Sequence, residues 1–210
     1  MAEYYVPARD CETEFTEKRS RFIGHIWRVE TEEEAREKIA QTKAQYHDAR
    51  HNCWCYILRE GKITRYSDDG EPQGTAGQPM LEVFRREGIE NVCCVVTRYF
   101  GGVLLGTGGL LRAYTTSAKD TLAQAGRAVV RQWAETAVEC PYSLLERVKQ
   151  EISSADGILG EIEYGAQVLI SALLPVEAYD LYAARITELT AGHCQVVHLG
   201  DCFRAAPIPE

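Results

Sequence analysis

The segment 97–114 (TRYFGGVLLGTGGLLRAY) holds five glycines and two arginines between a β-type run and a helix-type run. Glycine allows positive φ angles and lets another molecule approach the backbone N–H groups closely. A helix that begins within the segment adds the positive end of its dipole. The pattern therefore indicates either an anion-binding corner or a tight connection that only permits close packing. The candidate residues of this glycine motif are Arg98, Gly101, Gly102, Gly106, Thr107, Gly108, Gly109 and Arg112.

The glycine motif is not a standard nucleotide-binding loop. Gly101 and Gly106 have the spacing of a Walker A loop, but Thr107 stands where that loop needs lysine. The run that begins at Gly106 does not complete G-x-G-x-x-G either, because Leu111 occupies the place of the last glycine. The motif therefore names no ligand.

The segment Ser67–Pro79 (SDDGEPQGTAGQP) lacks an apolar period and is predicted to be a loop. It places three carboxylates within four residues, which suits a divalent cation or a basic partner. Its spacing is not that of an EF-hand, and a solvated turn at Asp69-Gly70 is the alternative. A long polar loop in a compact domain is more often functional than idle. The candidate residues of this acidic motif are Asp68, Asp69, Glu71, Gly74 and Thr75.

Two interpretations of the arginines connect these motifs. Arg98 and Arg112, with tyrosines beside them, suit phosphate or RNA through bidentate hydrogen bonds and stacking. In the alternative, Tyr99 packs in the core and Arg98 pairs with a carboxylate of the acidic motif. Both interpretations predict that the two motifs meet in space.

The other reactive side chains predict neither a catalytic centre nor a metal site. His51, Cys53 and Cys55 alternate, so one strand face could carry half a zinc site, but no second cluster completes it. A buried face of small side chains with one hydrogen-bonded histidine is the preferred interpretation. Cys93 and Cys94 lie in an apolar run, where burial would raise the thiol pKa. None of the eight cysteines forms a CxxC pair, and the protein is expected in a reducing compartment.

Composition and charge limit the class of protein. The chain has 210 residues, 45% of them apolar, enough for one large domain or two small ones. It has no apolar run of about 18 residues and begins with an acidic segment unlike a signal peptide, so a cytoplasmic protein without membrane contact is predicted. Residues 134–210 hold 4 of the 23 basic and 12 of the 31 acidic residues, and so carry the whole net charge of −8. Any contact with a polyanion is therefore expected from residues 1–133.

The first part, 1–133, reads as an α+β sandwich. Strands are expected at 14–16 and 21–29, a hairpin at 52–58 and 62–66, a buried central strand at 92–99 and a closing strand at 128–133. A capping box at Thr31 to Glu34 predicts a helix to about residue 46, and further helices are expected at 79–86 and 108–125.

The second part, 134–210, has a more regular pattern. Strands are expected at 135–140, 158–164, 167–174 and 194–199, with helices from Pro141 to about Ser154 and from Pro175 to Gly192. The order is β-α-β-β-α-β, the ferredoxin-like split unit. The predicted boundary between two domains lies near residue 133, almost without a linker.

Four segments resemble the Impact/YigZ family, in its bacterial two-domain form. They are KRSRFIGHIWRV at 18–29, HDARHNCWCY at 47–56, RYSDDGEPQGTAGQPMLEV at 65–83 and VVTRYFGGVLLGTGGLLRAY at 95–114. The resemblance implies a first domain with the fold of elongation factor G domain IV and of the GHMP-kinase N-terminal domain. It also implies a second domain similar to elongation factor G domain V.

The resemblance further implies a role in translation that does not involve enzymatic activity. Eukaryotic members of the family regulate translation initiation by binding an activator of a starvation-responsive kinase, and association with nucleic acid or ribosomes is the common proposal for bacterial members. We therefore expect a non-enzymatic cytoplasmic factor without cofactor, which binds RNA, the ribosome or a translation-associated protein and has no DNA specificity. The alternative is an enzyme that acts on a phosphorylated small molecule or nucleotide at the glycine motif, with Asp68 or Asp69 holding a metal.

Overall fold

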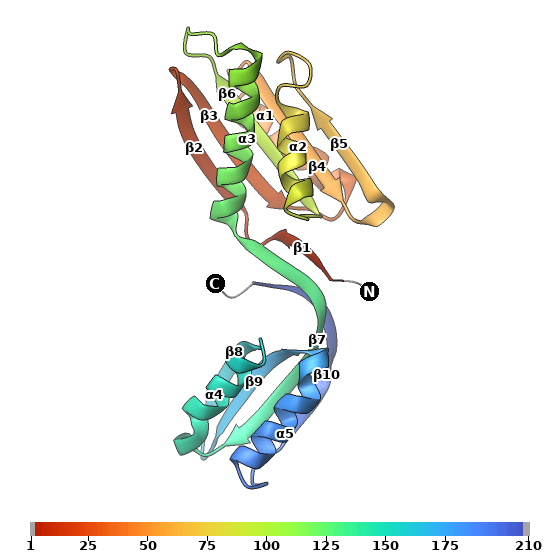
Figure 1. The fold of residues 1–210 in the computed structure, drawn as a ribbon, viewed down its shortest axis with the longest axis vertical. Helices are drawn as coiled ribbons and strands as arrows, with labels where there is room; N and C mark the ends of the chain where they lie inside the picture. The colour runs from red at the N-terminus through yellow and green to blue at the C-terminus, as the bar shows by residue number, and fades with distance from the viewer. Residues whose placement is uncertain (1–2, 208–210) are drawn as a thin grey trace. The chain divides into compact units, whose positions relative to one another are not determined.

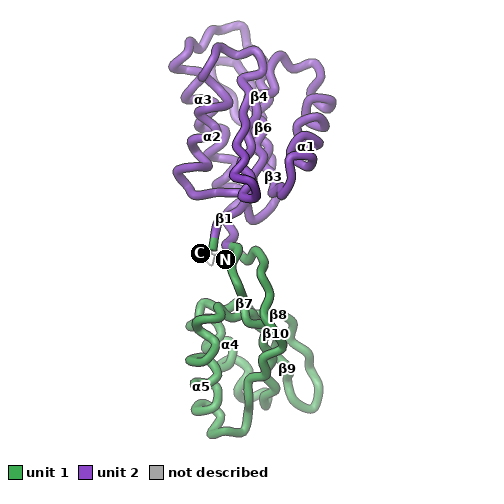
Figure 2. Tube along the Cα trace, turned by 90° about the vertical axis from the view of Figure 1, so that its right-hand side faces the viewer, with its two compact units in different colours: residues 1–3, 130–210 green, residues 4–129 purple. Residues whose placement is uncertain are grey.

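The computed structural model describes residues 3–207 as a mixed α+β protein with two five-stranded sheets and helices α1 to α5 (Figure 1). The described chain separates into two compact units, residues 4–129 and residues 130–207 with residue 3 (Figure 2). Both this division and the predicted boundary after residue 133 fall inside one strand, β7 (Arg127–Cys140). The predicted domains also include residues 1–2 and 208–210, which lie outside the described residues.

The unit 4–129 is built on an antiparallel sheet in the order β2-β3-β6-β4-β5. Strand β6 is central, and seven of its eight residues are buried, as its continuous apolar run predicts. The strands of this sheet are β2 (Cys11–Glu17), β3 (Ser20–Arg28), β4 (His51–Leu58), β5 (Ile63–Ser67) and β6 (Val92–Tyr99).

Helices cover both faces of this sheet (Figure 2). Helices α2 (Gly77–Arg86) and α3 (Gly106–Ala125) lie on one face, and α1 (Glu32–Gln45) lies on the other. Alternation along β6 serves both cores, because Cys94 and Val96 join the cluster under α2 and α3, while Cys93 and Val95 join the cluster under α1. The helix start predicted at Thr31 is confirmed by a bond of 3.1 Å from the Glu34 N–H to the Thr31 hydroxyl, while the Glu34 carboxylate accepts from the Glu30 N–H at 2.6 Å.

The cysteines behave as small apolar residues. Six of the eight are buried, and Cys11 and Cys202 are half-buried. Burial raises the pKa of the Cys93 thiol to about 12 and that of Cys55 well above its usual range. These thiols therefore remain protonated and unreactive at neutral pH.

The unit 130–207 has the predicted order β-α-β-β-α-β, with its strands in the order β10-β7-β9-β8 and both helices on one face of the sheet (Figure 2). Alternate residues of the strands, among them Val138, Ile170 and Leu174, pack against the helices. Its remaining elements are α4 (Leu145–Ser154), β8 (Ile158–Tyr164), β9 (Val168–Pro175), α5 (Tyr179–Leu189) and β10 (Val196–Pro207).

Several elements differ from the prediction, among them β2, which is longer than the strand expected at 14–16. The strands expected at 128–133 and 135–140 form the single 14-residue strand β7. Strand β1 (Tyr4–Pro7), which pairs with β7, was not predicted, and β10 is longer than the strand expected at 194–199. Helices α2 and α3 each begin two residues before the predicted start.

Among the described residues, no helix has the length and apolar character needed to cross a bilayer.

Candidate functional site

Asp68 of the acidic motif is a helix cap. One carboxylate oxygen accepts hydrogen bonds from the N–H groups of Ala76 at 3.0 Å and Gly77 at 2.8 Å, and the other accepts from Gly74 at 2.8 Å. These groups lie at or just before the start of α2, where backbone donors lack partners within the helix. The Asp68 carboxylate therefore orders the loop and has little capacity left for a ligand.

Asp69 is also engaged within the unit. Its carboxylate oxygens lie 2.6 Å from the Lys43 ammonium of α1 and 2.7 Å from the Asn52 N–H of β4. Its backbone has a φ of 44°, and its carbonyl oxygen lies 2.9 Å from His51 Nδ1. Asp69 therefore fastens the loop to α1 and β4.

Glu71 forms a buried ion pair with Arg98 of β6. The charged groups are 2.7 Å apart, with side-chain exposures of 3% for Glu71 and 6% for Arg98. Tyr114 of α3 donates its hydroxyl to the same carboxylate at 2.9 Å, and Ser20 accepts from Arg98 at 3.3 Å. Burial raises the pKa of the Tyr114 hydroxyl, so it remains a neutral donor. The structure thus confirms that Arg98 pairs with an acidic-motif carboxylate and that the two motifs meet.

The glycine motif forms the connection between β6 and α3. Gly101 lies against the turn between β2 and β3, because a Cβ atom there would approach the Arg19 backbone to 2.0 Å. Gly102 and Gly106 have φ angles of 84° and 71°, which disfavour residues with a side chain. Helix α3 begins at Gly106 without a side-chain cap and without an acidic residue in its first turn. Its first N–H groups are therefore open to an anion.

A cavity of about 520 Å³ lies where the two motifs meet. We call it the corner cavity. Its acidic-motif side includes Gly70 and Glu71, and its glycine-motif side includes Arg98, Gly106 and Thr107. Its other lining residues are Arg50, His51, Pro72, Phe100, Leu104, Leu105 and Leu110.

The remaining predicted site residues do not line the corner cavity. Arg112 is exposed on α3, and the Thr75 hydroxyl is bonded to the Pro72 carbonyl oxygen at 2.6 Å. Gly74 lines a different cavity, between α2 and α3. Tyr99 is not a core residue, because it is only half-buried and donates to the Asp48 carboxylate at 2.7 Å. The predicted residues that do not line the corner cavity are Gly101, Gly102, Gly108, Gly109, Arg112, Asp68, Asp69, Gly74 and Thr75.

Sequence reasoning missed the cavity's apolar wall and several cations. Phe100 and Leu104 of this wall are 44% and 83% exposed. They were missed because the glycine motif alone does not indicate which of its apolar residues face solvent. Lys18 and Arg19 are exposed at the turn that touches Gly101. The positive φ angles of both residues, 45° and 67°, define this turn, and a Lys-Arg pair between two predicted strands is the signal that could have found them.

Four exposed cations without an ion pair among the described residues surround this end of the unit; we call them the corner cations. They are Lys18, Arg19, Arg50 and Arg112. Nearby Arg21 is neutralised by Glu14 at 2.6 Å. Two exposed carboxylates are close to these cations in sequence. Glu17 has no ion pair among the described residues, and Asp48 accepts a hydrogen bond from the Tyr99 hydroxyl. The corner therefore carries excess positive charge.

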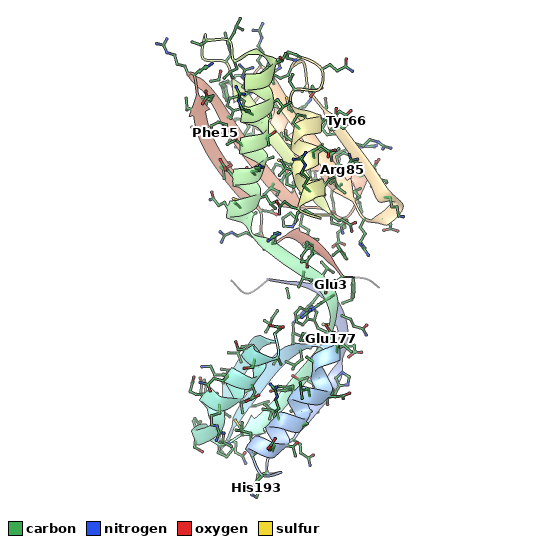
Figure 3. The ribbon with its side chains drawn as sticks, in the orientation of Figure 1. Glu3, Phe15, Tyr66, Arg85, Glu177 and His193 are labelled. Atoms are coloured by element: carbon green, nitrogen blue, oxygen red, sulfur yellow. The ribbon has the colours of Figure 1, made fainter. Side chains whose placement is uncertain are left out.

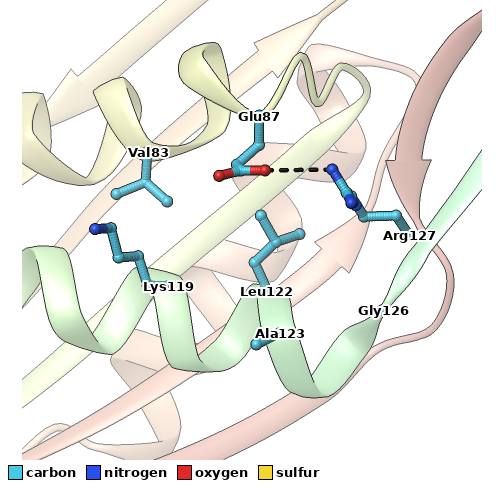
Figure 4. Close-up of a pocket in the computed structure, with 7 residues that line it drawn as sticks. All are labelled: Val83, Glu87, Lys119, Leu122, Ala123, Gly126 and Arg127. Atoms are coloured by element: carbon cyan, nitrogen blue, oxygen red, sulfur yellow. Dashed lines mark hydrogen bonds and ion pairs between the residues drawn. The ribbon is translucent and has the colours of Figure 1, made fainter.

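Two further cavities lie along the groove between α2 and α3. The one in Figure 4, of about 480 Å³, lies where Val83 and Leu122 face each other. At its edge the Glu87 carboxylate and the Arg127 guanidinium form an ion pair at 3.3 Å. This groove contains only Gly74 of the predicted site residues, in its second cavity of about 470 Å³.

Comparison with known proteins identifies the family. The Impact N-terminal domain matches residues 18–122, and a domain of unknown function, DUF1949, matches residues 138–193. IMPACT family member YvyE of Bacillus subtilis is 37% identical over 197 residues, which are 93% of this chain and 91% of the relative. The chain belongs to the IMPACT family. The resemblance of the four sequence segments is thereby confirmed.

Other IMPACT family relatives also match along most of their length. YigZ of Escherichia coli is 31% identical over 204 residues, which are 96% of this chain and 100% of the relative. A crystal structure described only as that of a hypothetical protein is 30% identical, with a TM-score of 0.60 over 95% of this chain and 98% of that one. The mixed α+β fold is therefore similar to that of a solved structure over most of both chains. The matched Impact N-terminal domain contains all the predicted site residues.

Proposed function

We propose that this IMPACT family protein is a non-enzymatic cytoplasmic factor that binds RNA of the translation apparatus and regulates translation. The contact would be made by the corner cations and the open first turn of α3. The proposal rests on a difference between the acidic and the basic side chains at this end of the unit. The carboxylates of the acidic motif are all bonded within the unit, whereas the corner cations are exposed and have no ion pair among the described residues.

Charge and backbone suit phosphate at this place. Exposed arginine and lysine attract the phosphate backbone at long range, and a helix N-terminus offers N–H donors to a phosphate oxygen. Gly106 and Gly108 leave open space where a side chain would stand. The surplus of carboxylates in residues 134–210 directs RNA away from that part of the chain.

The proposed folds of the two domains agree with a role beside the ribosome. We infer from the family resemblance that the first domain is similar to elongation factor G domain IV and the second to domain V. The sheet with two helices on one face and the β-α-β-β-α-β order support this likeness.

Salt-dependent binding of a labelled RNA tests the proposal. In a corner variant, Lys18, Arg19, Arg50 and Arg112 are replaced by glutamine. In the matched control, four exposed cations remote from the start of α3 are replaced, namely Lys62, Arg65, Arg86 and Lys119. Each lost phosphate contact lowers the slope of log K against log salt by about 0.7, so the corner variant should lose up to about 3 units of slope.

The control variant should keep the wild-type slope. Equal losses in both variants would mean non-specific attraction to charge and would contradict the corner as the binding site. Sedimentation with ribosomes at low salt, before and after RNase treatment, separates RNA from a protein partner. Binding that survives complete digestion assigns the contact to a protein instead.

An enzyme acting on a nucleotide or phosphorylated small molecule is the second candidate, favoured by the size of the corner cavity. Its volume of about 520 Å³ is within the range of small-molecule sites. However, Asp68 and Asp69, the proposed metal ligands, are occupied as a cap and an ion pair. Turnover of a nucleotide by the wild-type chain, lost in Asp69→Ala with the fold intact, would establish the enzyme.

A further inference from the structure

The corner cavity combines two surfaces of different chemistry. One wall is apolar and includes Phe100, Leu104 and Leu105. Leu104 is 83% exposed and Phe100 is 44% exposed, so both present apolar surface to solvent. Contact with a phosphate backbone alone requires no such surface. The apolar wall therefore indicates that the ligand has a flat or apolar part as well as an anionic part.

Other lining residues of the cavity suit an anion. Gly106 and Thr107 of the first turn of α3 line it, and no side chain caps this helix of 20 residues. A second, independent feature is the Arg98 guanidinium, which lines the same cavity with a side-chain exposure of 6%. Its Nε–H is buried and has no hydrogen-bond partner among the described residues. Arg50 adds an exposed cation at the cavity.

We propose that the corner cavity binds one unpaired nucleotide of a single-stranded RNA. The phosphate would lie at the first turn of α3 and beside Arg50, and the base would pack on the Phe100 ring and the leucine wall. This inference rests on the proposed RNA binding and adds the class of RNA. Bases of a duplex are stacked and paired inside it, whereas an unpaired base can be inserted into a pocket and stacked on an aromatic ring.

The exposed Phe100 ring lies beside the Arg98 guanidinium. The Arg98 guanidinium carbon lies 5.6 Å from its centroid and also 5.6 Å from the centroid of buried Phe22. Arg98 is in turn held by the Glu71 carboxylate. The Phe100 ring therefore lies next to the buried Arg98–Glu71 ion pair and still presents apolar surface on which a base can pack.

The test compares single-stranded with duplex RNA on the full chain. A fluorescein-labelled 12-nucleotide RNA and the same RNA annealed to its complement are titrated with wild-type protein and with Phe100→Ala. Tyr66→Ala is the matched control, because Tyr66 is 47% exposed on β5 and does not line the corner cavity (Figure 3). Leu104→Ser is a second variant that leaves the buried core untouched, since Leu104 is 83% exposed.

We expect the single strand to bind at least about 10-fold more tightly than the duplex. Phe100→Ala should weaken single-strand binding by about 5- to 150-fold, the range found for lost base stacking. Leu104→Ser should weaken it to a smaller extent. Tyr66→Ala should leave it unchanged, and duplex binding should be the same in all variants.

Three results would overturn the inference without removing RNA binding. One is equal affinity for single-stranded and duplex RNA, and a second is an equal loss of both in Phe100→Ala. If a nucleoside monophosphate displaces the single strand at equal or lower concentration, the cavity belongs to a free nucleotide and the inference is also wrong. Failure of the proposed function is distinguished from these results by the absence of salt-dependent binding to either RNA.

Discussion

The guanidinium of Arg98 lies 2.7 Å from the carboxylate of Glu71, and the pair joins the glycine motif to the acidic motif inside the protein. Both side chains are more than nine-tenths buried, so the pair is a structural link between the central strand and the loop. Because removal of one partner leaves a buried charge uncompensated, a substitution of Arg98 lowers the stability of the folded protein in addition to any effect on RNA binding. This is the reason that the corner variant spares Arg98.

Glu71→Gln should destabilise the protein by about 3–5 kcal/mol, the usual cost of breaking a buried ion pair. Replacement of both residues in Arg98→Met/Glu71→Gln should cost less than the sum of the single changes, because no unpaired charge remains. Urea unfolding at pH 7, followed by circular dichroism, measures all three variants. Strictly additive losses would contradict the pairing.

Asp68→Ala should lower the free energy of unfolding by about 1–3 kcal/mol. The change removes the acceptor of three backbone N–H groups before and at the start of α2. Asp68→Asn keeps an acceptor and should cost less. Asp10→Ala, at an exposed aspartate, is the control and should be neutral in the same urea experiment.

The glycines of the glycine motif should respond in opposite directions. Gly101→Ala should destabilise the protein by about 1–3 kcal/mol, since its Cβ would overlap the Arg19 backbone. Gly108 lies within α3 with open space around its Cβ position. Gly108→Ala should therefore stabilise the protein by about 0.5–1 kcal/mol through helix propensity. Melting temperatures from calorimetry would give the sign of each change.

His25 makes stability depend on pH. Burial lowers its pKa below 6.5, an effect only partly opposed by the Glu12 carboxylate at 3.4 Å. The unfolded chain therefore binds a proton more readily than the folded one, so the contribution of His25 is complete above pH 6.5 and stability is lost as the pH falls below that value. In His25→Phe this loss should disappear, while the packing on Trp27 is retained.

The measurement is the difference in unfolding free energy between wild type and His25→Phe at several values between pH 7.5 and 5.5. The wild type should weaken relative to the variant as the pH decreases. If the wild type instead gains stability relative to the variant, Glu12 rather than burial controls this histidine.

The elements were largely predictable from local signals. The capping box at Thr31 placed α1, and the apolar run at 92–99 placed the central strand. The prediction divides strand β7 in two at Ala134, because this residue carries no local sign that a strand continues across it. Its continuity depends on pairing with β9 along residues 133–140, which only the tertiary structure supplies.

The candidate site was predictable only in part. Spacing suggested that the motifs meet, but it could not distinguish Glu71, which pairs with Arg98, from Asp68, which caps a helix. Lys18 and Arg19 were missed because their place beside Gly101 depends on a strand pairing distant in sequence. The use of each carboxylate is decided by the backbone that folds around it, and this is not encoded in composition.

Photo-cross-linking identifies the residues of the chain that contact RNA. A single-stranded RNA that contains 4-thiouridine is bound to the full chain at low salt, irradiated and digested, and the linked peptides are sequenced by mass spectrometry. We expect adducts in segments 18–21 and 98–112, and their loss in the corner variant but not in the control variant. Adducts confined to residues 130–207, or adducts equally strong in the corner variant, would contradict this expectation.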